Sequence, residues 1–569
     1  MATLDFIQTI KEKRKAGHTA FLLQFNTNDR YFDPQSPNPP LPLRLAIAAS
    51  FPQHDVGYYS QSTGMMPLIR PDDGRRSIFT HRSPEERPVE TLSRGIRLLR
   101  EGERRLLIID FAAFLIPNGM ADMLHPDTRR IIEIMMRVSM DDELRRRDSF
   151  VIGITYEGNV IHDLVRRNWC LIGLPLPDES DRKAYYQLLL KRGDFAPLDD
   201  DITEHEFLSL SRGCRLKDIE SVMRQAYAEG RKVNRDDLNA VRESTLNALV
   251  GKLLVVRKPS GLTFDDVAGM EPLRRFVTSV VKAVKEGRYN LAPAGFLLQG
   301  PPGTGKSFVV DPIAHAFGYP ILEWRNLKSM WLGQSEANMD SALKAIEAMN
   351  PVVVFIDEAD QLLTGREEGP SGDSGTSGYM FGRLLNFMGD GRLKGKVIWV
   401  LCSNRPDLID PALADRIGCC VPLLRPSKRT IPNIIRSLAK QLNIKLDIPE
   451  SELPSIVNRL PEQISIRKLK DLMGMAALRS GEGHITTDAL KDALSDLLFS
   501  EDRMKIDYWT LLAVRMATYA SLLPWMEGGK VIPEEIPPCL REIVNPETGE
   551  IDAERLDKEI RQLSSIVGI

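Results

Sequence analysis

The segment from Gly300 to Ser307 reads Gly-Pro-Pro-Gly-Thr-Gly-Lys-Ser and combines residue types that bind phosphate. It follows an apolar run at 296–298, which we expect to be a buried strand. Glycines let backbone N–H groups converge on phosphate oxygens, the Lys306 ammonium can neutralise the β- and γ-phosphates, and the Ser307 hydroxyl can bind Mg²⁺. The other expected phosphate-binding residues are Gly300, Pro302, Gly303, Thr304 and Gly305. The pattern predicts a site for a nucleoside triphosphate.

Two carboxylates end a second apolar run, about fifty residues further along the chain. Residues 352–356 predict a buried strand, and Asp357 and Glu358 follow it directly. We expect Asp357 to lie beside the Mg²⁺ held by Ser307, and Glu358 to polarise an attacking water. The alternative is a surface acidic pair after a core strand, and the phosphate-binding segment upstream disfavours it.

A third apolar run, at 397–401, leads into Asn404. An uncharged amide at the end of a strand can hydrogen-bond to a γ-phosphate or to the attacking water. An Asn in a turn before Pro is also common for purely structural reasons. Its position in the motif set favours the functional interpretation.

The order of these motifs is similar to that of the AAA clade of AAA+ ATPases, over residues 261–495. The resemblance implies an ATPase that uses ATP and Mg²⁺ and works as a homo-oligomeric ring, a hexamer or similar. The sequence contains no Asn-Lys-x-Asp guanine motif, which favours ATP over GTP. Segment 261–269 resembles the family's entry segment, in which Asp266 and Val267 would contact the adenine.

Two regions depart from the usual AAA pattern. The family supplies two arginines that act on the neighbouring subunit's site, but this chain has only Arg416, with Asp415 at the other position. We expect Arg416 to be the arginine finger rather than Arg405. The alternative is a salt bridge within the subunit. In the following helical segment Arg467 resembles the second sensor arginine of other AAA+ clades and is a candidate γ-phosphate contact.

Trp331 lies in a segment, 328–336, that matches the family's first pore loop. In that family an aromatic side chain at this position grips an extended polypeptide in the channel of the ring. A large amphipathic ring can hold varied side chains without sequence preference. The alternative is that Trp331 is an ordinary packing residue.

The elements that must position these residues form two similar halves. Short apolar runs alternate with helical patterns, which predicts parallel α/β sheets. The fold class is therefore α/β, with two P-loop-NTPase-like three-layer αβα sheets, each followed by a helical lid, plus a helical C-terminal tail. The expected domains are a degenerate AAA-like domain at 1–203, its lid and linker at 204–260, the ATPase domain at 261–427, its lid at 428–500 and the tail at 501–569.

The first half lacks the chemistry of the second. The predicted strand at 21–25 leads into Asn-Thr-Asn-Asp-Arg, with no glycine loop and no lysine at P-loop spacing. Asp110 is retained, but Phe111 replaces the catalytic glutamate and Gly158 aligns with Asn404. Such a domain cannot hydrolyse ATP. A degenerate copy ahead of one active module resembles the hypothetical chloroplast frame AAA group of cyanobacteria and algal plastids.

Composition narrows the choice of partners and compartment. The 569 residues are 43% hydrophobic and 27% charged, with a net charge of −3, so no basic field indicates nucleic acid. The six cysteines show no metal-binding spacing, which predicts free thiols in a reducing, cytoplasmic setting. The N-terminus does not resemble a signal peptide, and the late apolar stretch 509–523 is too short to span a bilayer.

Two functions remain open at this point. The first is a ring ATPase that remodels or unfolds protein clients, threading them past Trp331. The second is an ATP-controlled assembly or regulatory module that docks a partner without translocation, which the lone finger arginine and the inert first copy favour. A nucleic-acid motor is disfavoured by the neutral charge.

Overall fold

The structure is a computed structural model. It describes the chain except for residues 1–4, 33–38, 70–76, 118–123, 157–160, 251–253, 258–259, 326–334, 363–373, 482, 499–501 and 569. Trp331, the predicted pore-loop residue, lies outside the described residues. The chain divides into two compact units. The first is Met1–Leu254 with Gln334–Met349, and the second is Val255–Gly333 with Asn350–Ile569.

The first unit is built on a six-stranded sheet with the strand order β5-β4-β6-β7-β1-β8. Its strands are β1 (Ala20–Phe25), β4 (Asp55–Ser60), β5 (Gly64–Ile69), β6 (Arg105–Ile109), β7 (Phe150–Ile154) and β8 (Cys170–Leu174). All pairs are parallel except β4–β5, and a small antiparallel pair joins β2 (Arg30–Tyr31) to β3 (Leu41–Pro42).

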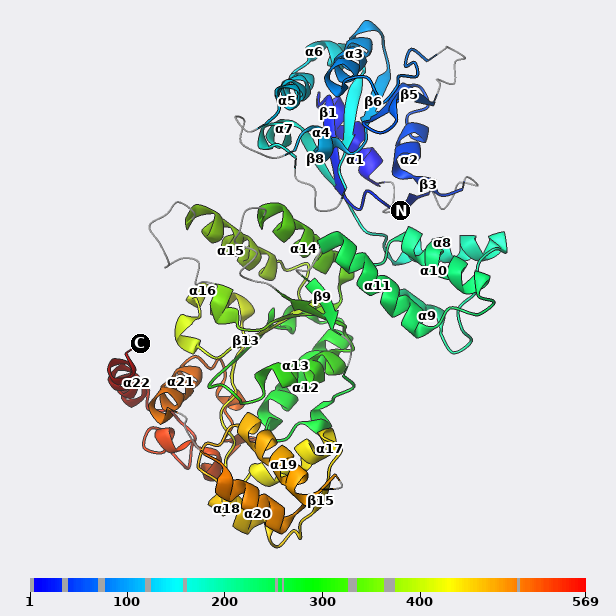
Figure 1. Ribbon diagram of the computed structural model, residues 1–569. Coiled ribbons are helices and arrows are strands. Elements are labelled where there is room, and N and C mark those ends of the chain that lie inside the picture. Colours follow the sequence, from blue (N-terminus) through cyan, green and yellow to red (C-terminus); the bar gives the residue numbers. More distant parts are fainter. Residues whose placement is uncertain are drawn as a thin grey trace. The chain divides into compact units, whose positions relative to one another are not determined.

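Helices cover both faces of this sheet, because alternate strand residues are apolar on each side. On one face Phe21 and Ile152 pack against α1 (Asp5–Lys15) and α2 (Leu43–Ala49). On the other face the core includes residues of α3, α5 and α7. The helices of this part are α3 (Pro88–Glu101), α4 (Ala112–Leu115), α5 (Pro126–Ser139), α6 (Asp142–Arg146) and α7 (Asp163–Asn168). The result is a three-layer αβα arrangement (Figure 1).

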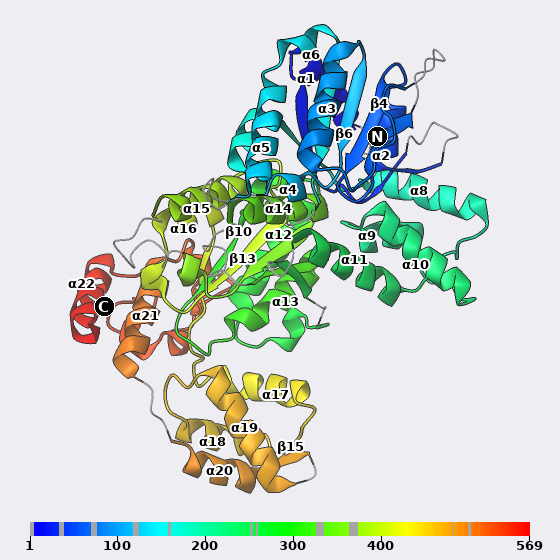
Figure 2. The ribbon, with the colours of Figure 1, turned by 45° about the horizontal axis from the view of Figure 1, so that its top comes forward.

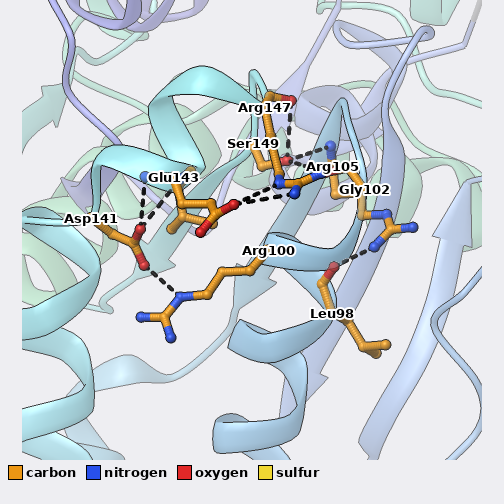
Figure 3. A network of polar contacts seen from close by, with 9 residues as sticks. Leu98, Arg100, Gly102, Arg105, Asp141, Glu143, Arg147 and Ser149 are labelled. Carbon is orange, nitrogen blue, oxygen red and sulfur yellow. Dashed lines mark hydrogen bonds and ion pairs between the residues drawn. The ribbon is translucent and has the colours of Figure 1, made fainter.

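Charged residues near the amino ends of the central strands tie α3 to α6 (Figure 3). Arg100 Nε donates to Asp141 Oδ2 at 2.7 Å, and the same carboxylate accepts the Glu143 N–H at 3.0 Å, capping α6. Arg147 Nη2 lies 3.1 Å from Glu143 Oε1. These arginines therefore serve the local structure, with the modest energies that exposed ion pairs contribute.

The first lid, which we define as α8–α11, follows the first sheet. It comprises α8 (Glu179–Arg192), α9 (Glu204–Leu210), α10 (Leu216–Ala228) and α11 (Arg235–Val250). It has its own core, in which Tyr185 and Leu189 of α8 pack with Phe207 and Ile219. Helix α8 shares this core although it falls within the expected 1–203 segment. The contacts of α14 (Ser335–Met349) group it with the first unit, next to α11.

The second unit repeats the same sheet. Its strand order is β14-β10-β13-β12-β11-β9. The strands are β9 (Leu254–Arg257), β10 (Gly295–Gln299), β11 (Ile321–Trp324), β12 (Val352–Ile356), β13 (Val397–Ser403) and β14 (Cys420–Pro422). Counting along the chain, β1, β4, β6, β7 and β8 correspond to β10, β11, β12, β13 and β14, and these five strands have the same order in both sheets. A shared strand order is what an internal duplication produces.

The second sheet is also covered on both faces. Phe296 and Leu298 belong to a core with α12 (Glu271–Lys285) and α13 (Lys306–Phe317), which lie side by side in Figure 1. On the other face Trp399 contacts Phe387 of α15 (Ser374–Met388), and α15 packs against α16 (Pro411–Ile417). The prediction of two P-loop-NTPase-like α/β sheets is therefore confirmed.

The second lid, α17–α20, forms a separate bundle in Figure 2. Its elements are α17 (Ile431–Gln441), α18 (Leu453–Arg459), α19 (Ile466–Ser480), α20 (Thr487–Asp496) and the parallel pair β15 (Lys445–Asp447) and β16 (His484–Thr486). It has its own apolar core.

The C-terminal tail is helical with a small hairpin. It contains α21 (Arg503–Arg515), β17 (Met526–Glu527), β18 (Lys530–Val531) and α22 (Ala553–Val567) around a core at Trp525 and Leu540. Short 3₁₀ helices in this unit are η3 (Phe264–Asp266), η4 (Tyr289–Leu291), η6 (Ala359–Leu362), η8 (Pro406–Leu408), η9 (Ala520–Leu522), η10 (Pro533–Glu535) and η11 (Pro538–Leu540). Among the described residues no helix has the length and apolar character needed to cross a membrane.

Candidate nucleotide site

The phosphate-binding segment lies where the sequence predicted it, between the end of β10 and the start of α13. Two of its glycines are required by close contacts. Gly300 has φ +144°, and a Cβ there would lie 2.3 Å from the Leu423 carbonyl oxygen. Gly303 has φ +79°, and a Cβ there would lie 2.8 Å from Ser465 Cβ in the second lid. Side chains at these positions would force the loop away from its neighbours.

Lys306 is the first residue of α13, and its side chain is buried inside the loop. Its Nζ donates to the carbonyl oxygens of Gly300 at 2.9 Å and Pro301 at 2.7 Å. Thr304 helps to hold the same turn, because its hydroxyl donates to the Pro301 carbonyl at 3.2 Å. Burial lowers the pKa of Lys306 to about 8. A triphosphate would offer this ammonium stronger acceptors than neutral carbonyls.

The residues expected to hold Mg²⁺ are in contact with each other. Ser307 Oγ donates to Asp357 Oδ2 at 3.0 Å, across 50 residues of sequence. The hydroxyl and the carboxylate are oxygen donors at one place, which is the ligand type that Mg²⁺ takes in nucleotide sites, along with waters and phosphates. The described residues form no cluster of three or more His, Cys, Asp or Glu. A site with few protein ligands therefore fits Mg²⁺ that arrives with a nucleotide.

Glu358 has an unusual backbone conformation for a non-glycine residue. Its φ is +50°, and its N–H donates to Asp357 Oδ1 at 3.0 Å. Left-handed non-glycine residues cost free energy and are concentrated at functional sites. This turn directs the chain so that Asp357 and Glu358 both line one cavity.

That cavity has a volume of about 540 Å³, and it gathers most of the predicted site residues. It is lined by eleven of them: Asp266, Val267, Gly303, Thr304, Gly305, Lys306, Ser307, Asp357, Glu358, Asn404 and Arg467. Gly300, Pro302 and Arg416 do not line it. Residues that the sequence reasoning missed also line it, and they come mostly from the second lid: Ile434, Ser437, Gln441, Lys470 and Asp471. Of these residues, only Lys470 and Asp471 could have been found from the sequence. They lie one helical turn beyond Arg467 and therefore share its face of the helix.

The second lid contacts the phosphate-binding loop directly. The Ile466 N–H donates to the Gly303 carbonyl at 2.8 Å, and Ser465 caps α19 by accepting the Lys468 N–H at 3.2 Å. Arg467 therefore lies in the first turn of α19, against the loop. The structure brings this lid arginine and Lys306 to the same cavity.

The entry segment also lines the cavity and is bonded to the second lid. Lys440 Nζ donates to Asp266 Oδ1 at 2.6 Å, and the Thr263 N–H donates to Oδ2 at 3.0 Å. The hydrogen bond from Lys440 lowers the pKa of Asp266 to about 2. Because its carboxylate is engaged in this way, the backbone at Asp266 and Val267 is the part that can face a base.

Asn404 and the two candidate finger arginines have different environments. Asn404 follows β13, where Ser403 Oγ donates to Asp360 Oδ1 at 2.8 Å. Arg405 Nη2 lies 2.6 Å from the buried carboxylate of Asp407. Arg416 lies in the last turn of α16, is exposed, and has no ion-pair partner among the described residues.

The corresponding place in the first unit is filled by aromatic side chains. Asp110 is buried and accepts hydrogen bonds from the hydroxyls of Tyr58 and Tyr156, each at 2.8 Å. Phe111 has φ +51° and donates its N–H to Asp110 at 3.0 Å, so its backbone matches that of Glu358. Its ring stacks on Tyr156 with centroids 4.5 Å apart. Burial raises the pKa of Tyr58 to about 12, which keeps its hydroxyl a donor. Gly158 lies outside the described residues.

Comparison with known proteins agrees with this geometry. Residues 296–422 match the model of the ATPase family associated with various cellular activities, abbreviated AAA. The chain is 25% identical over 423 residues to Protein CdcH of Halobacterium salinarum, and the match covers 66% of this chain. It spans 56% of the length of that relative. Residues 296–422 are therefore similar to an AAA ATPase domain, and the candidate nucleotide site lies at the ends of β10, β12 and β13, beside the second lid.

Proposed function

We propose that this chain is an ATP-hydrolysing AAA ring ATPase that remodels or unfolds protein substrates. One observation carries the proposal: a single cavity is lined by a phosphate-binding loop, two strand-end carboxylates, a strand-end amide and a lid arginine. We assign hydrolysis to the ATPase domain at 261–427 and its lid at 428–500. Each group has a defined task in hydrolysis.

The tasks follow from the positions. Lys306 leaves the loop carbonyls to bind the β- and γ-phosphates, and Ser307 and Asp357 hold the Mg²⁺, which neutralises phosphate charge when bound. Glu358 accepts the proton of the attacking water as the water oxygen bonds to the γ-phosphorus, the bond from that phosphorus to the bridging oxygen breaks, and ADP leaves. Asn404 orients the same water or the γ-phosphate. Arg467 contacts the γ-phosphate from the lid, so hydrolysis weakens the closed position of the second lid.

Arg416 completes the site of a neighbouring copy. It lies on the surface and outside its own cavity, and a guanidinium from the next subunit would neutralise charge that develops on the phosphate. This arrangement requires a homo-oligomer, which we propose to be a hexamer or a similar ring. Trp331 would then move a bound polypeptide along the channel.

A second candidate function is an ATP-controlled assembly or regulatory module that docks a partner without threading it. The observation that favours it is the first unit, whose Asp110 is enclosed by Tyr58 and Tyr156. A domain of this kind suits docking rather than catalysis. The combination of one degenerate and one complete site also supports a proposed relationship to the hypothetical chloroplast frame AAA group.

Replacing Glu358 by Gln should separate binding from hydrolysis. We expect ATP affinity to stay within about threefold of wild type, since the amide keeps the shape, and the hydrolysis rate to fall by roughly 10²-fold or more, as expected for loss of a general base. Lys306→Ala should instead lose ATP binding. Binding of a fluorescent ATP analogue and phosphate release measure the two quantities. Hydrolysis at the wild-type rate in Glu358→Gln would refute the assigned base.

Mixing two inactive variants should test whether Arg416 acts on its neighbour. Arg416→Ala retains a complete site but lacks the finger, and Lys306→Ala retains the finger but lacks the site. In mixed rings, some interfaces join the intact site of Arg416→Ala to the intact finger of Lys306→Ala, so hydrolysis should reappear on mixing. Random assembly of equal amounts gives about one such interface in four, so the rate should reach up to about a quarter of the wild-type rate. No recovery would place Arg416 within its own subunit. Arg405→Ala is the matched control and should keep most activity, because Arg405 is paired with Asp407.

Replacing Trp331 by Ala should discriminate between the two candidate functions. If the chain threads polypeptides, the variant should lose unfolding of a tagged fluorescent protein and the stimulation of hydrolysis by unfolded protein, while basal hydrolysis persists. If both activities remain intact, threading is excluded. Slow hydrolysis that unfolded protein does not stimulate in the wild type would support the docking module.

The pH dependence of ATP binding should report the state of Lys306. Its pKa of about 8 means that the free protein carries the ammonium below that pH and loses it progressively above. Phosphate favours the charged form, so binding above pH 8 should take up a proton, and affinity should fall by up to about tenfold per pH unit. Calorimetry in buffers of different ionisation enthalpy measures the uptake. At pH 7 Lys306 is already charged in the free protein, so it should contribute almost no proton uptake. Equal proton uptake at pH 7 and above pH 8 would contradict the assigned role of Lys306.

A further inference from the structure

The loop after β1 lies at the same place in the first sheet as the phosphate-binding loop after β10 does in the second sheet. β1 ends at Phe25, which is paired with Leu174 at the end of β8. β10 ends at Gln299, which is paired with Pro422 at the end of β14. The fourth residue after each strand end is Asp29 in the first unit and Gly303 in the second.

Asp29 is a buried carboxylate, with 5% of its surface exposed, and it accepts hydrogen bonds from three surrounding groups. Its Oδ1 accepts the Arg30 N–H at 2.8 Å and the Lys217 N–H at 3.0 Å. Its Oδ2 accepts from Asn26 Nδ2 at 2.9 Å. Burial raises the pKa of Asp29, and the Lys217 N–H opposes that rise. The carboxylate thus lies at the N-terminus of α10, a helix of 13 residues, where a negative charge is stabilised.

In the second unit, the N–H groups at the start of the lid helix meet a neutral acceptor instead of a carboxylate. There the Ile466 N–H at the start of α19 donates to the carbonyl of Gly303, which is neutral. In both units, therefore, the first turn of a lid helix contacts the fourth residue of the loop. The first unit supplies an anion at this point from its own chain, whereas the second would take one from a bound phosphate.

A further contact reinforces the junction in the first unit. Arg30 Nε donates to Glu220 Oε2 on α10 at 3.0 Å, and the hydroxyl of Tyr185 on α8 donates to the same oxygen at 2.7 Å. Glu220 is largely buried, with 11% of its side chain exposed. The loop after β1 is thus linked to two helices of the first lid by charged, partly buried hydrogen bonds, which are among the stronger ones in proteins.

We infer that Asp29 is a built-in substitute for a nucleotide phosphate, which holds the first lid closed on the first sheet without any ligand. The first unit is then a permanently closed body, and ATP moves only the second lid. The contrast with the second unit rests on the proposed function, whereas the contacts of Asp29 are observed independently of that function.

Hydrogen exchange of the full chain, with and without Mg²⁺ and ATP, tests the inference. Asp29→Ala leaves the N–H groups of Arg30 and Lys217 without an acceptor, so exchange in the first two turns of α10 should accelerate about tenfold. Asn28→Ala is the matched control, because Asn28 is an exposed residue of the same loop, and it should leave α10 unchanged. ATP should protect α17 and α19 while leaving α10 unaffected.

Two results would overturn the inference. One is wild-type exchange of α10 in Asp29→Ala. The other is protection of α10 by ATP in Lys306→Ala, which would show a nucleotide bound to the first unit. If Asp29→Ala does not fold, Asp29→Asn keeps one oxygen for the two N–H groups but removes the charge, and it should show a smaller acceleration in α10. No acceleration in that variant also refutes the inference. If ATP fails to protect α19 in the wild type, the proposed function fails, and the Asp29 variants still decide whether the first lid is held by Asp29.

Discussion

The candidate nucleotide site depends on one geometric constraint, the parallel pairing of β10, β12 and β13. Parallel neighbours end at the same edge of a sheet, so residues that follow these strands must lie close together. The register pairs Gln299 with Ser403 and Ile356 with Leu401. The phosphate-binding loop, Asp357 and Asn404 therefore meet at one edge although about a hundred residues separate the first from the last. A shift of one residue in either pairing would turn these side chains to the other face.

The two units show which part of such a site is scaffold and which part is chemistry. Phe111 and Glu358 share a left-handed backbone and the same N–H contact to the preceding Asp. The backbone turn is thus retained in the first unit although a phenyl ring cannot activate water. There the aspartate is bound by Tyr58 and Tyr156, so a buried charge that would otherwise be costly is satisfied within the chain. In the proposed degenerate copy, the tyrosine hydroxyls therefore take the place of contacts that a ligand would make.

Much of this arrangement could be predicted from the sequence, because strands and phosphate-binding loops leave local signals. The apolar runs predicted the sheets, and the spacing of glycines, Lys306 and Asp357 predicted residues that the structure brings to one cavity. The contribution of the second lid could not be obtained in this way. Ser437 and Gln441 lie on α17 and have no local pattern that relates them to a loop more than 130 residues away. The role of Asp29 escaped prediction for a similar reason, because it depends on Lys217, which lies 188 residues further along the chain.

The contact between the lid helix and the loop differs between the two units, and this difference bears on whether each lid can move. The neutral carbonyl of Gly303 accepts the N–H groups of Ile466 at 2.8 Å and Arg467 at 3.4 Å, and neutral hydrogen bonds of this kind contribute only about 0.5–1.5 kcal/mol net each. In the proposed function, a bound phosphate shifts this lid by binding its closed position more tightly than its open one. The carboxylate of Asp29 adds charge-assisted bonds at the equivalent position, and the link from Arg30 to Glu220 adds another. Under the proposed function, the same topology therefore gives one lid that a nucleotide moves and one that the chain itself holds, and the difference begins at the fourth residue of a loop.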